Sequence, residues 1–136
     1  MYARWLHERL TRHGADRLLL TLDALGEVPL ELVPSLLELV GSGEEALAEL
    51  DEEHLVARRG SQFADDPVLA VVAPRSGIAI LRSLVPGRGA GVSVADVARA
   101  MARQVAPDSV QALYWGALGG DAEAASDFVE FVLAHP

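Results

Sequence analysis

The sequence predicts a mainly α protein that contains one short β-hairpin. Apolar residues recur at helical spacing through most of the chain, and glycine or proline stands near the ends of the helical segments. One stretch, residues 55–64, is instead typical of two short strands that meet at Gly60 and Ser61. Apolar residues make up 51% of the 136 positions, so the chain can bury a core.

Glycines and prolines divide the N-terminal part into helical segments. Tyr2, Trp5, Leu6 and Leu10 share one face of a first helix, which Gly14 ends. Further helices are expected at residues 17–25, from about Pro29 with a kink or restart at Pro34, at residues 44–54, from Pro67 to residue 72, and at residues 76–85.

The loop PGRGAG, residues 86–91, separates this part from a C-terminal helical unit. We expect units at residues 1–86 and 87–136 that share one core. Ser93 is placed to cap a helix over residues 94–105, and a second helix covers residues 109–118. A terminal helix begins near Asp121, so the C-terminal unit is a helical hairpin followed by one more helix.

Four features follow one another in residues 29–73. They are a Pro-Leu-x-Leu helix, a helix that ends in a leucine-valine pair, an arginine-containing wing and an aromatic-x-x-x-Pro helix start. The corresponding residues are Pro29, Leu30, Leu32, Leu55, Val56, Arg58, Arg59, Phe63 and Pro67. This segment resembles the winged-helix domain of bacterial signal-transduction ATPases with numerous domains. The resemblance implies a winged-helix-like N-terminal unit that clamps against another protein and need not bind DNA. The chain departs from that family because it has no G-x-x-x-x-G-K-[ST] sequence and no lysine.

Residues 91–120 show a second resemblance, to the helix-turn-helix of bacterial repressors. The segment that would read the bases offers Ser109 and Gln111 but no arginine or lysine. We therefore expect a structural helical hairpin there.

Carboxylates dominate the helix that would enter a DNA groove. Residues 43–67 contain eight acidic residues and two arginines, a formal charge of −6, within a chain of charge −9. Such a charge repels phosphate, which favours a protein partner. The candidate contacts here are Glu45, Glu49, Glu52, Glu53, Arg58 and Arg59, and an ordinary solvated surface is the alternative for all of them.

Aromatic and apolar residues suggest a second contact region near the C-terminus. Trp115 is a candidate interface residue, and Phe128, Phe131 and Leu133 give the terminal helix more apolar surface than one narrow packing stripe uses. These residues predict docking to a partner or a homodimer, with ordinary core packing as the alternative.

No catalytic, cofactor or metal site emerges from the residue patterns. His7 and His13 stand six positions apart, which is poor spacing for one metal on a helix, and no G-x-S-x-G elbow or cysteine exists. No apolar run is long enough for a membrane span, and no secretory signal is evident. We expect a cytoplasmic, non-enzymatic interaction or regulatory module without cofactors. The alternative is a small DNA-binding regulator with a basic face built from Arg4, Arg9, Arg12, Arg58 and Arg59.

Overall fold

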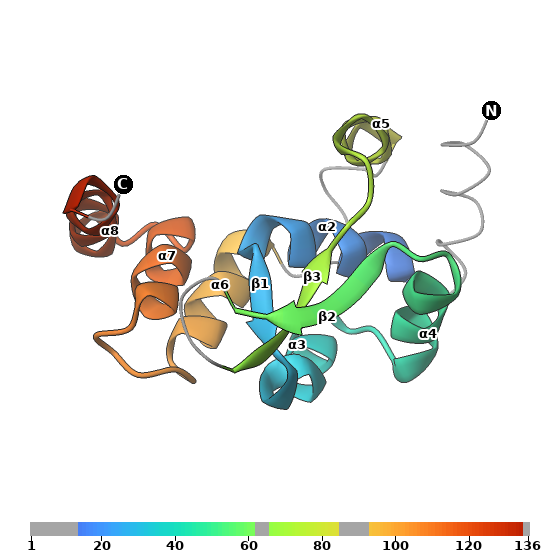
Figure 1. The fold of residues 1–136 in the computed structure, drawn as a ribbon, viewed down its shortest axis with the longest axis horizontal. Helices are drawn as coiled ribbons and strands as arrows, with labels where there is room; N and C mark the ends of the chain where they lie inside the picture. The colour runs from blue at the N-terminus through green and yellow to red at the C-terminus, as the bar shows by residue number, and fades with distance from the viewer. Residues whose placement is uncertain (1–13, 62–65, 85–92, 135–136) are drawn as a thin grey trace. The chain divides into compact units, whose positions relative to one another are not determined.

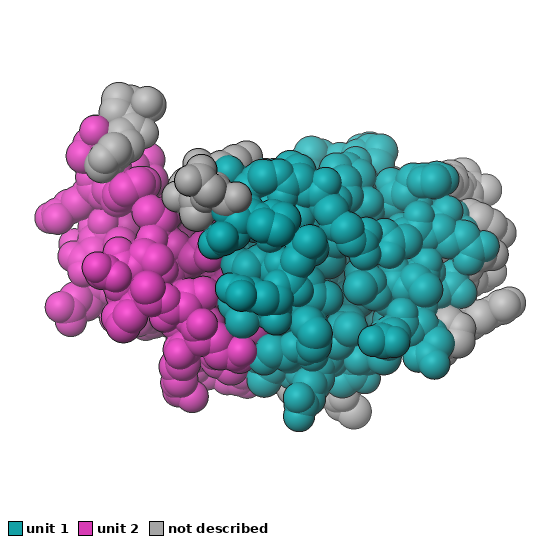
Figure 2. Space-filling model, turned by 60° about the horizontal axis from the view of Figure 1, so that its bottom comes forward, with its two compact units in different colours: residues 1–91 teal, residues 92–136 magenta. Residues whose placement is uncertain are grey.

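The structure is a computed structural model that describes residues 14–61, 66–84 and 93–134. This part of the chain contains helices and one small three-stranded antiparallel sheet (Figure 1), which confirms the predicted mainly α fold with a short hairpin. The chain divides into two compact units, Met1–Gly91 and Val92–Pro136 (Figure 2). Three parts of the sequence prediction lie outside the described residues. They are the helix at residues 2–10, the residue Phe63 and the loop at residues 86–91.

In unit 1 helices precede β1 and β2, and β3 follows β2 without a helix between them. The elements run in the order α2 (Ala15–Leu25), β1 (Glu27–Pro29), the 3-10 helix η1 (Leu30–Leu32), α3 (Val33–Val40), α4 (Glu44–Glu52), β2 (Val56–Gly60), β3 (Pro67–Val71) and α5 (Arg75–Leu84). The strand order is β1-β3-β2, so the last strand lies in the middle. Leu69 of β3 is opposite Val28 on one side and Arg58 on the other.

The segment that begins at Pro67 is a strand, so the helix predicted there is wrong. β3 is the returning strand of the hairpin. It starts at Pro67, whereas the predicted hairpin covered residues 55–64. Val68, Leu69 and Ala70 are all buried because β3 is the central strand. A short, continuously apolar run fits a buried helix and a buried strand equally well, and the pairing partners decide between them. Proline is tolerated at the first position of a strand.

Pro29 also belongs to a strand rather than to the start of a helix. It closes β1, where it is opposite Val68 of β3. The chain then makes η1 and enters α3 at Val33, so Pro34 stands in the first turn, where a missing N–H removes no helical hydrogen bond. The predicted restart near Pro34 is therefore confirmed.

The core of unit 1 is built around α2. Leu18, Leu19, Leu22 and Leu25 are fully buried at positions that share one side of this helix, as the predicted segment 17–25 requires. The helix contacts α3, α4, β1 and β3. Helix α4 and strand β3 of the hairpin therefore both pack against α2.

Two left-handed residues end α3 and α4. Gly41, with a φ of 79°, follows α3, and Ser42 N–H donates to the carbonyl of Leu37. His54, with a φ of 56°, has the same place after α4, where Leu55 N–H donates to the carbonyl of Leu50. These bonds satisfy carbonyl groups that the helices leave open at their ends. The short turn between α3 and α4 makes this pair a helix-turn-helix.

Unit 2 contains α6 (Val94–Ala102), α7 (Val110–Leu118) and α8 (Ala122–Ala134), which form the predicted helical hairpin and terminal helix. The Ser93 and Ser109 hydroxyls accept hydrogen bonds from the backbone N–H groups of Asp96 and Ala112, and Asp121 caps α8. Because α7 contacts both α6 and α8, it is the middle helix.

Glycines allow the helices of unit 2 to approach closely. A Cβ atom at Gly119 would lie 2.3 Å from Cγ of Arg99 and 3.3 Å from the carbonyl oxygen of Ala95. A Cβ atom at Gly116 would lie 3.0 Å from Cβ of Ala124. The α6–α7 and α7–α8 contacts therefore depend on the absence of side chains at these two positions. No helix among the described residues has the length and hydropathy needed to cross a membrane.

Candidate interaction surfaces

The solvent-facing side of α4 is acidic. Ala46 and Leu50 point into the core, whereas Glu44, Glu45 and Glu52 are exposed. The remaining predicted contacts, Glu49 on this helix and Glu53 directly after it, are half-buried and already take part in interactions within the protein. The helix contains five carboxylates and no basic residue. Its exposed face thus offers acceptors to cations and none of the donors that phosphate needs.

Arg58 of β2 is bound to the C-terminal part of α4. Its Nη1 and Nη2 donate to the two carboxylate oxygens of Asp51 over 2.8 Å and 3.1 Å. The hydrogen bond from Arg58 to Asp51 raises the pKa of Arg58, and partial burial opposes this increase. The guanidinium group therefore stays charged, and both of its parallel donors are occupied by the carboxylate. This contact links α4 to β2, and it reduces the availability of Arg58 to a partner.

Arg59, the neighbouring wing arginine, makes a different contact. Its Nη1 donates to the carbonyl oxygen of Gly60 over 3.0 Å, and the residue is exposed. No ion pair to a described carboxylate is formed by this side chain, in contrast to Arg58. Successive side chains of a strand point to opposite faces, which separates the two arginines. Both arginines are exposed, and Arg58 is the one of the two whose guanidinium group is paired with a described carboxylate.

A second cluster of charges joins α2 to α5, and sequence reasoning missed it. Arg82 donates from Nη2 to Asp23 over 3.1 Å, and Arg75 binds the other carboxylate oxygen of Asp23. Asp23 is nearly buried, while both arginines are exposed. Arg75 and Arg82 stand seven positions apart, which puts them on one face of α5, and this spacing was the available signal. Their partner is more than fifty positions away in the chain, so no local pattern indicates it.

Trp115 is fully buried, which corrects its prediction as an interface residue. It lies on α7, the middle helix of unit 2, where neighbours on two sides can cover a large side chain. Phe128 is half-buried on α8, with its ring centroid 5.3 Å from that of Tyr114 on α7. Phe131 is also half-buried. Phe128 therefore takes part in the α7–α8 packing.

The predicted contact residue Leu133 is 75% exposed, and it has exposed apolar neighbours on α8. Val129 and Val132 are 55% and 47% exposed. The three residues stand at i, i+3 and i+4, so they form one row along α8, which we call the apolar row. Helical spacing was the available signal for Val129 and Val132. Which apolar residues of α8 pack inward and which face solvent depends on the position of α7.

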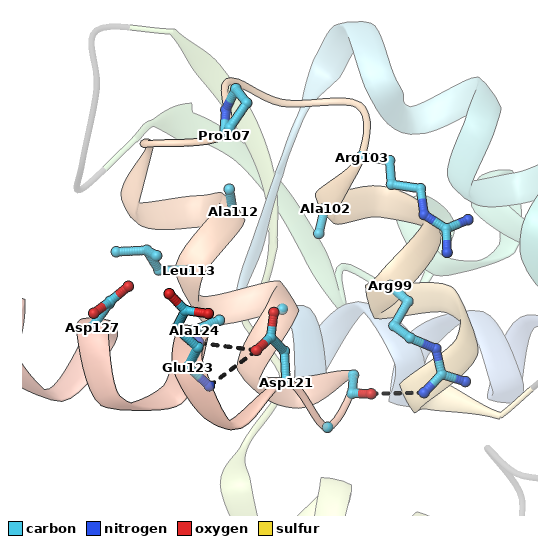
Figure 3. Close-up of a pocket in the computed structure, with 13 residues that line it drawn as sticks. Arg99, Ala102, Arg103, Pro107, Ala112, Leu113, Asp121, Glu123, Ala124 and Asp127 are labelled. Carbon is cyan, nitrogen blue, oxygen red and sulfur yellow. Dashed lines mark hydrogen bonds between the residues drawn. The ribbon is translucent and has the colours of Figure 1, made fainter.

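An open pocket of about 620 Å³ lies within unit 2 (Figure 3). Arg99 at its edge donates to the carbonyl oxygen of Gly119 over 2.7 Å, and Asp121 accepts hydrogen bonds from the backbone of Glu123 and Ala124. Arg99 therefore links α6 to the end of α7, and Asp121 caps the start of α8. Arg103, Glu123 and Asp127 also line the pocket and are exposed. The wall of the pocket therefore contains both apolar atoms and charged groups of both signs.

Comparisons with known proteins give no match. No protein-family model matches the chain, and no significant similarity was found to curated proteins or to solved structures.

Proposed function

We propose that this chain is a non-enzymatic protein-interaction module of the cytoplasm, whose unit 1 is a winged helix that contacts protein rather than DNA. The order of elements supports this proposal, because a helix-turn-helix, α3 and α4, is followed by a hairpin in the position of a wing. The family resemblance to the winged-helix domain of bacterial signal-transduction ATPases with numerous domains stays part of the proposal. In that family the domain usually clamps against another protein domain.

The observation that carries the proposal is the charge on the exposed face of α4. In a DNA-reading helix-turn-helix, the N-terminal residues of the second helix contact base edges. Here these residues are Glu44 and Glu45, which are exposed. Phosphate contacts supply most of non-specific DNA affinity, and like charges at this position oppose them. A protein surface with arginine or lysine is the complementary partner.

The contact between Arg58 and Asp51 weakens the alternative function, a small DNA-binding regulator. That alternative needs Arg58 and Arg59 to grip phosphate from the wing. Arg58 would have to exchange a two-fold hydrogen bond to a carboxylate for a phosphate contact. Arg4, Arg9 and Arg12, which would complete the basic face, lie outside the described residues.

A titration of labelled duplex DNA tests the proposal. We expect no saturable, salt-sensitive binding at micromolar protein at low or moderate salt. Binding that weakens with salt and disappears in the Arg58→Glu/Arg59→Glu variant would assign the regulator function instead. A pull-down with the intact chain supplies the positive arm: proteins retained by the wild type should be lost with Glu44→Arg/Glu45→Arg. Arg59→Glu should weaken the same complexes, whereas DNA binding by the wild type would contradict the proposal.

A further inference from the structure

We propose that the C-terminal half of α8 is a docking surface for a basic amphipathic helix of a partner protein. The inference concerns unit 2 and adds a second surface to the proposed function, without depending on α4 or the wing. Its basis is the apolar row, Val129, Val132 and Leu133, together with a row of exposed carboxylates on the same helix that adjoins it at Glu130.

Packing between α8 and α7 holds the apolar row in a fixed orientation. Phe128 and Phe131 lie on the adjoining side of α8 and are half-buried, and the Phe128 ring packs on Tyr114 of α7. These contacts fix the rotation of α8, so the row keeps its orientation to solvent. Large aliphatic side chains that remain about half or more exposed lose their contact with water when a partner covers them, which favours docking.

The carboxylate row consists of Glu123, Asp127 and Glu130. These residues stand at i, i+4 and i+7, so they line up along one side of the helix, and all three are exposed. Glu130 is three positions before Leu133 and therefore adjoins the apolar row. None of the three side chains forms an ion pair with a described residue, and α8 itself contains no basic residue. The surface thus combines apolar anchors with unneutralised negative charge.

The apolar row and the neighbouring negative charge together favour a partner helix that is both apolar and basic. An amphipathic helix presents anchors at i, i+3, i+4 and i+7, which matches the spacing of the apolar row. Arginine or lysine beside those anchors would face Glu130, and complementary charge of this kind gives specificity and raises the association rate. The occupant is therefore a helix with an apolar stripe next to a basic one.

A second copy of the chain fits this surface less well. Pairing two α8 helices would bring carboxylate rows of the same sign together, which costs free energy. Three side chains also supply only a fraction of the about 800 Å² per partner that stable, specific interfaces bury. A weak, charge-assisted complex with a short helix is consistent with this limited area.

Two synthetic peptides probe the surface in the intact chain. One is an amphipathic helix of leucine, alanine and arginine, and the other has glutamate in place of arginine. Fluorescence anisotropy should show that the arginine peptide binds, that salt weakens this binding, and that the glutamate peptide binds at least roughly tenfold more weakly. Equal binding of the two peptides, or no binding of either, would overturn the proposal.

Matched variants locate the binding on α8. Val129→Ser/Leu133→Ser and Asp127→Arg/Glu130→Arg should each weaken arginine-peptide binding roughly tenfold. The substituted side chains are exposed, and thermal unfolding of each variant checks that the fold is retained. Val72→Ser changes another exposed valine, and Glu31→Arg/Glu38→Arg makes the same change of charge at two exposed positions of unit 1 outside the α4 surface, so both controls should bind like the wild type.

The outcomes separate this inference from the proposed function. Loss of peptide binding in Glu44→Arg/Glu45→Arg but not in the α8 variants would refute the α8 surface and leave the proposed function intact. DNA binding by the wild type, with peptide binding still lost in the α8 variants, would refute the proposed function alone. Sedimentation that shows self-association at neutral pH, abolished by Val129→Ser/Leu133→Ser, would assign the surface to a second copy and overturn the inference.

Discussion

His54 stores backbone strain at the point where α4 turns into β2. It is the one described non-glycine residue with a positive φ, 56°, and it has the role that Gly41 has after α3. A side chain in this left-handed region costs free energy that glycine avoids, although glycine also loses more entropy on folding. His54→Gly should therefore raise the free energy of unfolding by about 0.5–1 kcal/mol, measured by urea denaturation.

The matched control is Gly41→Ala, which places a Cβ in the same conformation after α3. It should lower the free energy of unfolding by about 1 kcal/mol. A loss of stability in His54→Gly would instead show that the imidazole makes a stabilising contact that outweighs the strain.

Residue-scale features divide into those that sequence reasoning can reach and those that it cannot. Ser93 caps a helix as predicted, because a cap needs only neighbouring residues. Ser109 caps α7, for which the sequence predicted the start of the helix but not the cap. The carboxylates of α4 were identified from the sequence for the same reason. The pairing of Arg58 with Asp51 needs the hairpin and helix to meet in space, and the burial of Trp115 needs α7 to be the middle helix.

At the scale of elements, Gly119 controls the approach of α7 to α6. Gly119→Ala would place Cβ against Arg99 Cγ and near two backbone atoms, the carbonyl oxygen of Ala95 and the nitrogen of Arg99. The side chain can move but the backbone atoms cannot move as freely, so the variant should lower stability by about 1–3 kcal/mol. Thermal unfolding followed by circular dichroism measures this change.

Gly77→Ala is the control for this prediction. Gly77 lies in α5, and a Cβ there meets no atom within 4 Å, so alanine should keep or raise the unfolding temperature through its better helix propensity. Equal unfolding temperatures for Gly119→Ala and the wild type would contradict the close-packing account.

The helices were easier to predict than the sheet because helical periodicity is local. α2, α4 and the three helices of unit 2 follow from apolar spacing and caps. The strands β1 and β3 were missed because β1 has only three residues and β3 is apolar at three successive buried positions. Such segments become strands through their pairing with one another, and that pairing joins residues about forty positions apart.

At the scale of the whole molecule, a formal charge of −9 should keep copies apart at neutral pH. We expect sedimentation to show a monomer at pH 7 and low salt. As the pH falls toward the isoelectric point of about 4.8, the repulsion disappears and the apolar row of α8 can bring copies together. Val129→Ser/Leu133→Ser should reduce this acid-induced association. A dimer that is stable at pH 7 would contradict the expectation.

The hairpin also bears on solubility, through the free side of β2. Val72 N–H donates to Leu55 and Ser61 N–H donates to Asp66, so the alternating antiparallel ladder turns the backbone groups of Val56, Arg58 and Gly60 away from β3. No further described strand lies beyond β2. An edge of this kind can recruit a strand from another molecule and start aggregation, and charged side chains oppose such stacking. Arg58 and Arg59 therefore also protect the protein against edge-to-edge aggregation, independently of any partner they bind.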